Sequence, residues 1–325
     1  MAICYKCKGE ITTTNKSIEH IIPNALGGRL KSANLLCRPC NEKLGSSVDI
    51  ALSQKIPFAL LLNVKRDNGD NYKILGRDEH NKEFYIQRNP NTGALEAEQK
   101  PEKPQERTLE NGKKAKKFIG IKTITQYLES LKKKKPFLDI EEELAKVNWE
   151  QERGERNFTF YEEQLKGDLA NRALSKIGLE YFLHKGGGAL FVEDLIQIVF
   201  GNTQIVNGEI GAYYFQHRKD SIISLGANEV SHTLYLKGNH ESKTLFCYID
   251  LFSIYKYVIL LSKNYTGIEI ESLYCFDLLK QRDLSNEKTI SFAGNEPPIY
   301  GYSENEMINT FQSSKLRVKK IAGLV

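Results

Sequence analysis

The sequence predicts an α+β protein that begins with a small cysteine-rich module and continues into a larger domain with antiparallel strands. Three observations support this prediction. Four of the six cysteines lie within the first 40 residues, as two C-x-x-C pairs. Apolar residues recur at helical spacing in residues 162–188 and 191–201. Four successive segments between residues 231 and 276 then alternate apolar and polar residues, which is typical of antiparallel strands.

The chain of 325 residues is long enough for two domains, or for one large domain and a small module. We expect the module at residues 1–55, a β-rich extension with a basic linker and helices at 56–156, and an α+β domain at 157–325. The last domain would recognise the target or regulate activity.

Within the middle region, short strand-like runs occupy residues 56–95. Residues 95–117 are polar, contain prolines and show no apolar period, so we expect a linker or an exposed loop there. Residues 122–135 and 139–147 are expected to be helices, separated by Pro136.

The composition is that of a globular protein, with 40% hydrophobic and 27% charged residues and a mean hydropathy of −0.44. The net charge of +5 and the pI near 8.7 permit a nucleic-acid partner without demonstrating one. No apolar run approaches the roughly 20 residues that span a membrane, and the N-terminus lacks the pattern of a signal peptide. We therefore expect a cytoplasmic protein that does not interact with membranes.

The spacing of the first four cysteines favours a structural zinc site. Cys4 and Cys7 are followed, after a gap, by Cys37 and Cys40. Two C-x-x-C turns can complete the tetrahedral sulfur shell of one zinc ion, and a module with few large apolar residues gains stability from such a site. Disulfides or a redox motif are the alternatives, although a cytosolic chain disfavours structural disulfides. The remaining thiols, Cys247 and Cys275, stand in apolar strand-like segments and are expected in the core.

Four motifs occur in order within this module: "CYKC", "EHIIPNALGG", "NLLCRPCN" and "KLG". Together they resemble the HNH endonuclease family, in particular its zinc-binding branch with EHIIPxALGG and CxxCN motifs. The resemblance covers about 50 residues. It implies a ββα-metal fold, in which a β-hairpin and a helix surround one divalent cation, beside a separate structural zinc.

The residues between and beside the cysteines suit phosphodiester cleavage. An imidazole is the usual general base in proteins, so His20 is the candidate base, and Glu19 offers a hard oxygen ligand to Mg²⁺ or Mn²⁺. Asn41, directly after Cys40, would supply a second oxygen ligand. The resemblance further implies that Asn34 holds the loop and so fixes His20. The family more often has Asp at the position of Glu19 and His at the position of Asn41.

Basic residues could hold the nucleic acid. Arg29, Lys31, Arg38 and Lys43 lie in the module and could meet phosphates, although each could equally be a solvated surface charge. Residues 100–135 contain 12 basic and 4 acidic residues, a net charge of +8. This segment could follow a DNA backbone or could be a solvated linker and helix end.

These observations predict a metal-dependent endonuclease that hydrolyses DNA phosphodiester bonds. The resemblance associates it with bacterial restriction or anti-phage defence. Two alternatives remain: a nuclease effector gated by a signalling nucleotide, and a zinc protein that binds nucleic acid without cutting it. The expected partners are DNA and, at the C-terminal domain, a regulatory small nucleotide or a modified base. A homodimer is compatible with each of these functions.

Overall fold

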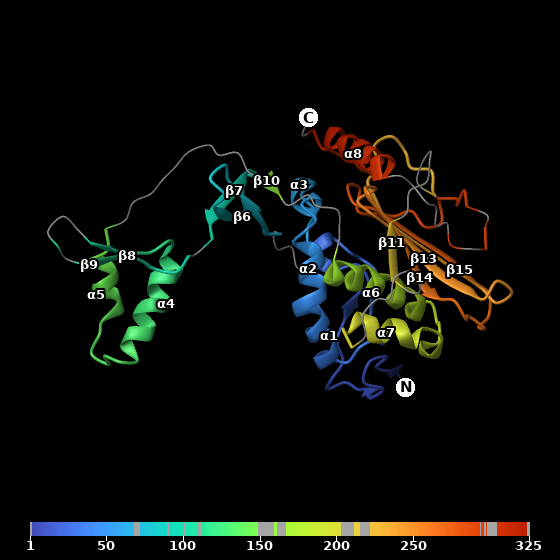
Figure 1. Ribbon diagram of the computed structural model, residues 1–325, viewed down its shortest axis with the longest axis horizontal. Coiled ribbons are helices and arrows are strands. Elements are labelled where there is room, and N and C mark those ends of the chain that lie inside the picture. Colours follow the sequence, from blue (N-terminus) through green and yellow to red (C-terminus); the bar gives the residue numbers. More distant parts are fainter. Residues whose placement is uncertain are drawn as a thin grey trace. The chain divides into compact units, whose positions relative to one another are not determined.

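The computed structural model divides the chain into two compact units, residues Met1–Tyr72 with Glu162–Val325 and residues Lys73–Tyr161 (Figure 1). It describes residues 2–67, 72–89, 91–100, 102–108, 112, 114–148, 159–160, 167–202, 211–214, 222–292, 294–295, 297 and 304–323. The cysteine-rich module and the C-terminal sheet thus belong to one unit, and most of the predicted middle region forms the other.

The cysteine-rich module consists of two short hairpins followed by a helix. Its elements are β1 (Ala2–Ile3), β2 (Glu10–Ile11), β3 (Glu19–His20), β4 (Lys31–Ser32), α1 (Arg38–Leu44), a π-helical turn η2 (Gly45–Asp49) and α2 (Ile50–Ser53). Cys37 is extended and precedes the first turn of α1, where a proline is well tolerated. Because the residues at the junctions between these three helical pieces keep helical angles, the chain runs through α1, η2 and α2 without a break. The hairpin β3–β4 and this helix form the predicted ββα arrangement.

The C-terminal part of this unit is built on an antiparallel sheet with the strand order β11-β14-β13-β12-β15-β16. The strands are β11 (Gly211–Tyr214), β12 (Ser231–Asn239), β13 (Thr244–Leu251), β14 (Tyr255–Ser262), β15 (Ile270–Asp277) and β16 (Arg282–Asp283). One face contributes Tyr235, Phe246 and Tyr248 to a buried cluster with Ile222 and Ile223. Helix α6 covers the other face, so the central strands are apolar on both sides.

Helix α6 (Asp168–His184) lies between the sheet and the cysteine-rich module (Figure 1), and it contacts β13 and β14 on one side and η2 and α2 on the other. Every residue from Ala173 to Phe182 is buried. Gly178 allows close packing, because a Cβ atom there would lie 3.2 Å from Cys247 Cβ and from Leu261 Cδ2. The shorter α7 (Glu193–Val199), preceded by the 3₁₀ turn η3 (Ala189–Val192), packs against α6.

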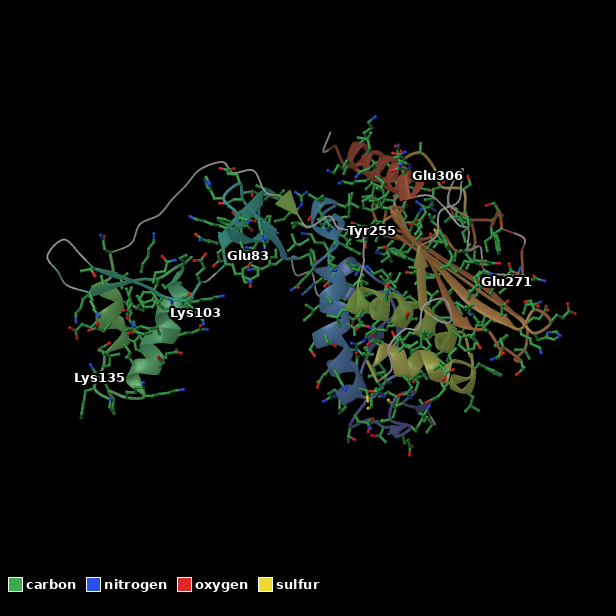
Figure 2. All side chains as sticks on the ribbon, viewed as in Figure 1. Glu83, Lys103, Lys135, Tyr255, Glu271 and Glu306 are labelled. Carbon is green, nitrogen blue, oxygen red and sulfur yellow. The ribbon has the colours of Figure 1, made fainter. Side chains whose placement is uncertain are left out.

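Two further helices pack on the edge of this unit near the start of β14. Tyr255, labelled in Figure 2, lies between Phe58 of α3 (Phe58–Leu61) and Phe311 of α8 (Glu304–Ile321), with ring centroids 6.2 Å and 5.4 Å away. These aromatic contacts join segments that are more than 200 residues apart in the chain.

The second unit contains a small sheet, a hairpin and a helix pair. The sheet has the order β10-β5-β6-β7, with β5 (Ile74–Arg77), β6 (Glu83–Arg88), β7 (Leu95–Gln99) and β10 (Thr159–Phe160). The hairpin joins β8 (Gln105–Thr108) to β9 (Lys114–Lys117), and α4 (Ile121–Lys132) and α5 (Ile140–Ala145) form the predicted helix pair. Lys135, labelled in Figure 2, lies in the turn between these two helices.

Two local predictions were wrong. Residues 95–117 were expected to form a linker but contribute β7, β8 and β9. The hairpin β8–β9 is exposed, and its pairing is supported by the opposite charges of Glu106 and Lys116 at facing positions, not by an apolar face. Residues 58–61, in a segment expected to be strand-like, form the helical turn α3. Among the described residues, no helix combines the length and apolar character that a membrane span needs.

Candidate functional site

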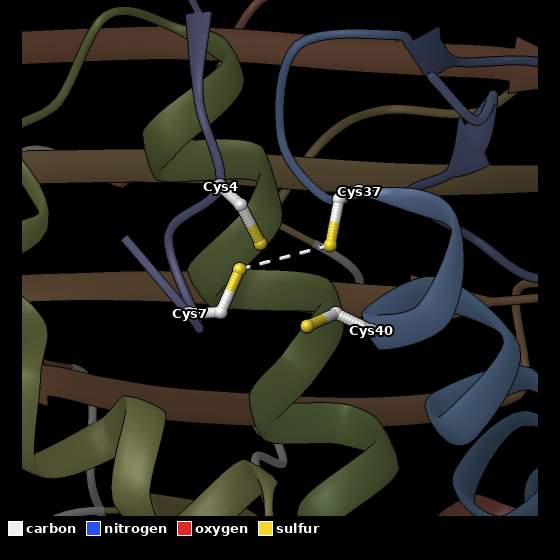
Figure 3. A group of neighbouring side chains, drawn as sticks. All are labelled: Cys4, Cys7, Cys37 and Cys40. Carbon is white, nitrogen blue, oxygen red and sulfur yellow. Dashed lines mark hydrogen bonds between the residues drawn. The ribbon is translucent and has the colours of Figure 1, made fainter. Parts of the chain in front are cut away.

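The four N-terminal cysteines converge on one point (Figure 3). The Sγ atoms of Cys4, Cys7, Cys37 and Cys40 all lie within 4.8 Å of one another, and none of these cysteines is in a disulfide. The Cys7 and Cys37 sulfurs are 3.7 Å apart. A tetrahedral zinc ion with bonds of about 2.3 Å separates its sulfur ligands by about 3.8 Å. The four thiols therefore fit such an ion, which would hold the first hairpin against the start of α1.

Backbone amides favour a thiolate at this point. Burial alone raises the pKa of Cys4, but hydrogen bonds from the backbone of Cys7, Cys37 and Lys6 outweigh it and lower the pKa to about 7. Deprotonated sulfur is the form that binds a metal ion. The backbone around Cys4 thus favours the form of this sulfur that binds a metal ion.

The loop between β3 and β4 is fixed by apolar anchors and two glycines. Ile21 and Ile22 are fully buried. Gly27 has φ of 82°, and a Cβ atom there would lie 2.2 Å from Val64 Cγ1. A Cβ atom on Gly28 would lie 1.8 Å from the carbonyl oxygen of Ile22. The motif "IIPNALGG" therefore makes a tightly folded turn that returns the chain to β4.

A histidine of the large sheet secures the same loop. His232 of β12 is buried, and its Nε2 donates to the carbonyl oxygen of Leu26 at 2.8 Å, while its Nδ1 accepts from the backbone N–H of Phe252 at 3.3 Å. Burial outweighs the hydrogen bond to Leu26 and lowers the pKa of His232 to about 4. The ring is therefore neutral at pH 7, and it links the loop to the sheet.

Glu19 and His20, the two residues of β3, point in opposite directions, as neighbours on a strand do. The Glu19 side chain is 3% exposed, and its Oε1 accepts a hydrogen bond from Lys176 of α6. His20 is 20% exposed and faces Asp67. The sequence predicted that both side chains would meet at one centre, but they lie in two separate charged clusters.

The first cluster is buried around Lys176, whose side chain is fully enclosed. Its Nζ donates to Asp49 at 2.9 Å and lies 3.6 Å from Glu180 Oε2. The other Glu180 oxygen accepts from the hydroxyl of Tyr5, at 2.9 Å, and Tyr5 stands between Cys4 and Cys7 in the sequence. Three carboxylates from β3, η2 and α6 thus surround one ammonium group.

The pKa values in this cluster follow from burial and from the shared charge. Burial lowers the pKa of Lys176, but the charges of Glu180, Asp49 and Glu19 outweigh it and raise the pKa above its usual value, so the ammonium stays charged. Burial and the neighbouring Glu19 raise the pKa of Glu180 well above its usual range. Burial also raises the pKa of Glu19, although Lys176 opposes this. Three carboxylates beside one ammonium favour a proton on one of them.

The second cluster is partly exposed and centres on Asp67. Its Oδ2 lies 2.8 Å from His20 Nε2, and its carboxylate also forms ion pairs with Arg29 and Lys31. Asn24 Oδ1 accepts from the backbone N–H of Asp67 at 2.9 Å and so fixes the position of this residue. Burial raises the pKa of Asp67, but its hydrogen bonds to Lys31, His20 and Arg29 outweigh it and hold the pKa well below its usual value.

Asn41 and Asn34 lie close to β3 and β4 respectively. The Nδ2 of Asn41 donates to Ser17 Oγ at 2.9 Å and to the carbonyl oxygen of Ile18 at 3.3 Å, which joins α1 to the start of β3. Asn34 is exposed, and its backbone N–H donates to Ser32 Oγ at 3.3 Å. The predicted roles of Asn41 as a cation ligand and of Asn34 as a brace for the loop stay predictions.

Sequence reasoning missed four charged residues of these clusters: Asp49, Asp67, Lys176 and Glu180. Lys176 and Glu180 stand in an apolar helical pattern in which two charged residues four positions apart on the buried side could have been noticed. Asp67 lies in a polar loop and carries no sequence signal.

Comparison with known protein families matches residues 4–57 to the HNH endonuclease family. The match covers both cysteine pairs, β3, β4 and the continuous helix α1–η2–α2. No curated protein and no solved structure gave a match.

Proposed function

Since residues 4–57 are a module of the HNH endonuclease family, we propose that this protein is a nuclease that hydrolyses phosphodiester bonds in DNA. One observation carries the proposal. Within the matched module, the only histidine is His20, and it is partly exposed beside two basic side chains, Arg29 and Lys31. A general base and two cations in reach of solvent are what hydrolysis of a phosphodiester needs.

His20 is the proposed general base. Because a carboxylate can only accept, the contact with Asp67 calls for a proton on Nε2, and in a neutral ring Nδ1 would then carry the free lone pair. Nδ1 would take a proton from water as the water oxygen attacks phosphorus. The bond from phosphorus to the leaving oxygen then breaks, and the leaving oxygen takes up a proton from solvent.

Arg29 and Lys31 would stabilise the phosphate. The guanidinium of Arg29 has five N–H donors, and the contacts to Asp67, Lys65 and Gln281 use four of them, which leaves one for a phosphate. Exposed lysines of the second unit, including Lys114 and Lys117 of β9, add positive charge that suits a long polyanion. This charge is compatible with DNA as the proposed substrate.

Zinc is the proposed ion at the four cysteines, because an all-sulfur tetrahedral shell is typical of structural zinc. A second, catalytic cation fits its predicted ligands less well than zinc fits the four cysteines. Its predicted ligands are Glu19 and Asn41, with Mg²⁺ or Mn²⁺ as the ion, but Glu19 is buried and its charge is already balanced by Lys176. Glu19 as it stands therefore does not fit a cation that shares a phosphate with His20, and no step is assigned to such a cation.

Cleavage of plasmid DNA tests the proposal. The wild-type protein and His20→Ala are incubated with supercoiled plasmid in Mg²⁺ or Mn²⁺. We expect nicked or linear DNA with the wild type and a loss of at least about a hundredfold in rate with His20→Ala, because general-base catalysis contributes roughly 10²–10⁴-fold. His80→Ala is the matched control, since His80 is exposed and lies in the second unit.

Binding measured in the same samples separates the alternatives. If the wild type binds the plasmid without cutting it in either metal, the protein is the non-cutting zinc protein and the nuclease proposal fails. If His20→Ala cuts as fast as the wild type, His20 is not the base. Cleavage that appears only when a signalling nucleotide is added would identify the gated effector.

A role in bacterial restriction or anti-phage defence, in the cytoplasm, is the biological setting we propose. The sheet of the C-terminal part would recognise a modified base or a small nucleotide. A homodimer stays a prediction. Loss of phage protection in cells that carry His20→Ala, compared with cells that carry His80→Ala, would support the defence role.

A further inference from the structure

A glutamine of the C-terminal part contacts Arg29, one of the two basic residues beside His20. Gln281 Oε1 accepts hydrogen bonds from Arg29 Nη2 at 2.9 Å and from Arg29 Nε at 3.3 Å. Because arginine can only donate, the oxygen of the Gln281 amide faces the guanidinium. The Nε2 of the same amide donates to the carbonyl oxygen of Leu278 at 2.5 Å. Both polar atoms of the Gln281 side chain are therefore bonded, and its orientation is fixed.

Gln281 lies in a short turn whose backbone is held by a buried carboxylate. The turn comprises residues 278–281 and joins β15 to β16. Asp277 is fully buried, and its Oδ1 accepts from the backbone N–H of Leu279 at 2.9 Å and from that of Lys280 at 3.2 Å. The turn is therefore a defined support for the Gln281 side chain.

The same turn packs against the loop that contains Arg29. A Cβ atom on Gly27 would lie 3.5 Å from Leu278 Cδ2, which is ordinary van der Waals contact. The hydrogen bond from His232 also joins this loop to β12 of the sheet. The backbone segments that carry Gln281 and Arg29 are thus held together by contacts other than the one between these two side chains.

The backbone angle at Gln281 indicates that the turn itself does not require glutamine. Its φ is 52°, in the left-handed region that Gly and Asn adopt with less strain. Strained backbone often occurs at functional sites. Gly has no side chain and that of Asn is shorter by one carbon–carbon bond, so neither residue could reach Arg29 as Gln281 does. The contact with Arg29 is therefore the feature that glutamine adds to this turn.

The contacts of Arg29 leave one direction for a ligand. The carbonyl oxygen of Lys65 accepts from Nη2 at 2.9 Å, so Nη2 uses both of its N–H groups and Nε uses its one. Among the described contacts, the remaining N–H is on Nη1, the nitrogen that bonds Asp67, and Asp67 also bonds His20. Gln281 thus binds the Nε and Nη2 edge of the planar guanidinium and leaves the Nη1 end for a ligand beside the proposed base.

We propose that Gln281 is a positioning residue for Arg29 and that the turn between β15 and β16 thereby completes the active site. This proposal rests on the proposed nuclease function. Gln281 does not touch the substrate. It fixes the guanidinium so that the remaining N–H of Arg29 is aligned with the charge that develops on the phosphate. Since the family match ends at residue 57, the matched module alone does not contain this support.

Gln281→Asn tests the proposal in the full-length protein. Asn adopts the left-handed conformation readily, and its side chain is about 1.5 Å shorter, so the backbone strain falls while the contact with Arg29 is lost. We expect kcat for plasmid cleavage to fall about tenfold, because the donor is no longer aligned. KM should change by less than about twofold, because the positive charge of Arg29 remains. Unfolding in denaturant should show no loss of stability.

Three further variants separate the causes. Gln281→Met keeps the length of the side chain without the acceptor, so it should lower kcat as Gln281→Asn does. Arg29→Met removes the charge as well, so it should lower kcat and raise KM. Gln54→Asn is the matched control, since Gln54 is an exposed glutamine directly after α2, and it should leave kcat, KM and stability unchanged.

A second measurement needs neither nucleic acid nor cleavage. The exchange of the Arg29 Nε–H with solvent is followed by NMR, and its resonance is identified by its absence in Arg29→Met. In the wild type this proton is bonded to Gln281. We expect it to exchange about tenfold faster in Gln281→Asn and in Gln281→Met, because a hydrogen bond from a charged group is lost.

Equal exchange of the Arg29 Nε–H in the wild type and in Gln281→Asn would overturn the proposal, because Gln281 then does not hold Arg29. An unchanged kcat in Gln281→Asn would overturn it as well. A fall in stability that accounts for the loss of rate would make Gln281 a structural residue only. If the wild type cuts no DNA, the proposed nuclease function fails, and the exchange measurement still decides whether Gln281 positions Arg29.

Discussion

The clusters at Glu19 and at His20 belong to neighbouring residues of one two-residue strand, yet they differ in almost every physical respect. The Glu19 cluster is buried, and its carboxylates outnumber the one ammonium group. The His20 cluster is partly exposed, and its basic side chains outnumber the one carboxylate. Strand geometry alone separates them, because successive side chains point to opposite faces.

The difference shows which cluster can act on a substrate directly. Charges around His20 are close to solvent, and their excess is positive, as binding of a phosphate requires. Charges around Glu19 are enclosed by α6, and their excess is negative. The outer cluster therefore suits the proposed catalysis, and the inner cluster suits attachment of the module to the rest of the unit.

Removal of the ion proposed at the four cysteines should have the largest effect on stability, because both clusters depend on the same module. Cys37→Ser, or treatment with a strong chelator, should unfold the module and abolish cleavage. The apparent binding free energy of structural zinc is about 10–16 kcal/mol. Zinc analysis together with circular dichroism measures the loss.

Cys247→Ser provides the comparison, since Cys247 is a fully buried thiol of β13 outside the metal cluster. This variant should lose some stability and keep its zinc. Equal zinc content in Cys37→Ser and the wild type would contradict the assignment of the four cysteines.

Glu19→Gln should have the next largest effect on stability. It leaves the buried Lys176 ammonium with one partner fewer, and breaking a buried ion pair costs about 3–5 kcal/mol. Unfolding in denaturant measures the change. Glu42→Gln, at an exposed position of α1, is the control and should change stability by less than about 0.5 kcal/mol. A similar effect of the two substitutions would mean that burial does not distinguish the Glu19 cluster.

The pH dependence of stability tests the contact between His232 and the loop that joins β3 to β4. The pKa of His232 is about 4, against 6.5 for an ordinary histidine. Below pH 6.5 the unfolded chain therefore binds a proton that the folded protein does not bind. The contribution of His232 to stability falls as the pH decreases to about 4, by about 3 kcal/mol in total.

His232→Gln keeps a donor for the Leu26 carbonyl but does not titrate. The difference between the two pH profiles isolates the histidine from the carboxylates that titrate in the same range. We expect the wild type to lose stability relative to the variant between pH 6.5 and 4. A constant difference across this range would show that His232 is protonated in the folded protein.

Much of this arrangement could be predicted from short patterns. The cysteine spacing predicted a metal site, and Cys4, Cys7, Cys37 and Cys40 do converge. Helical periodicity predicted α6 and α7, and alternation predicted strands β12 to β15. Cys247 and Cys275 were expected in the core, and both are fully buried. These features depend on residues close together in the sequence, where spacing constrains geometry.

The partners of the two clusters could not be predicted, because they depend on contacts between distant segments. Lys176 meets Glu19 across 157 positions, and His232 meets Leu26 across 206. The sequence pattern around one residue of each pair does not specify its partner. The linker prediction for residues 95–117 failed for a different reason, since the hairpin β8–β9 pairs polar residues and has no apolar face to detect.

Substitution of Asp67 is expected to change the stability of the protein least. Asp67→Asn removes the one carboxylate of the His20 cluster, so Arg29, Lys31 and His20 lose their shared partner. Solvent screens these charges, and the loss of stability at pH 7 should be about 1 kcal/mol. Because the pKa of Asp67 lies well below its usual 3.8, the wild type keeps this contribution above about pH 4 and loses it as the pH falls further.

The same substitution should strengthen binding of nucleic acid, because a negative charge is removed beside the groups that would hold the phosphate. A change of about 1 kcal/mol corresponds to about fivefold in affinity for a short duplex at low salt, and the gain should shrink as salt is added. Glu193→Gln, which removes an exposed partner of Lys8, should leave affinity unchanged. Weaker binding by Asp67→Asn would mean that Asp67 is needed to position Arg29 and Lys31, and the outer cluster would then depend on its counter-ion as strictly as the inner one does.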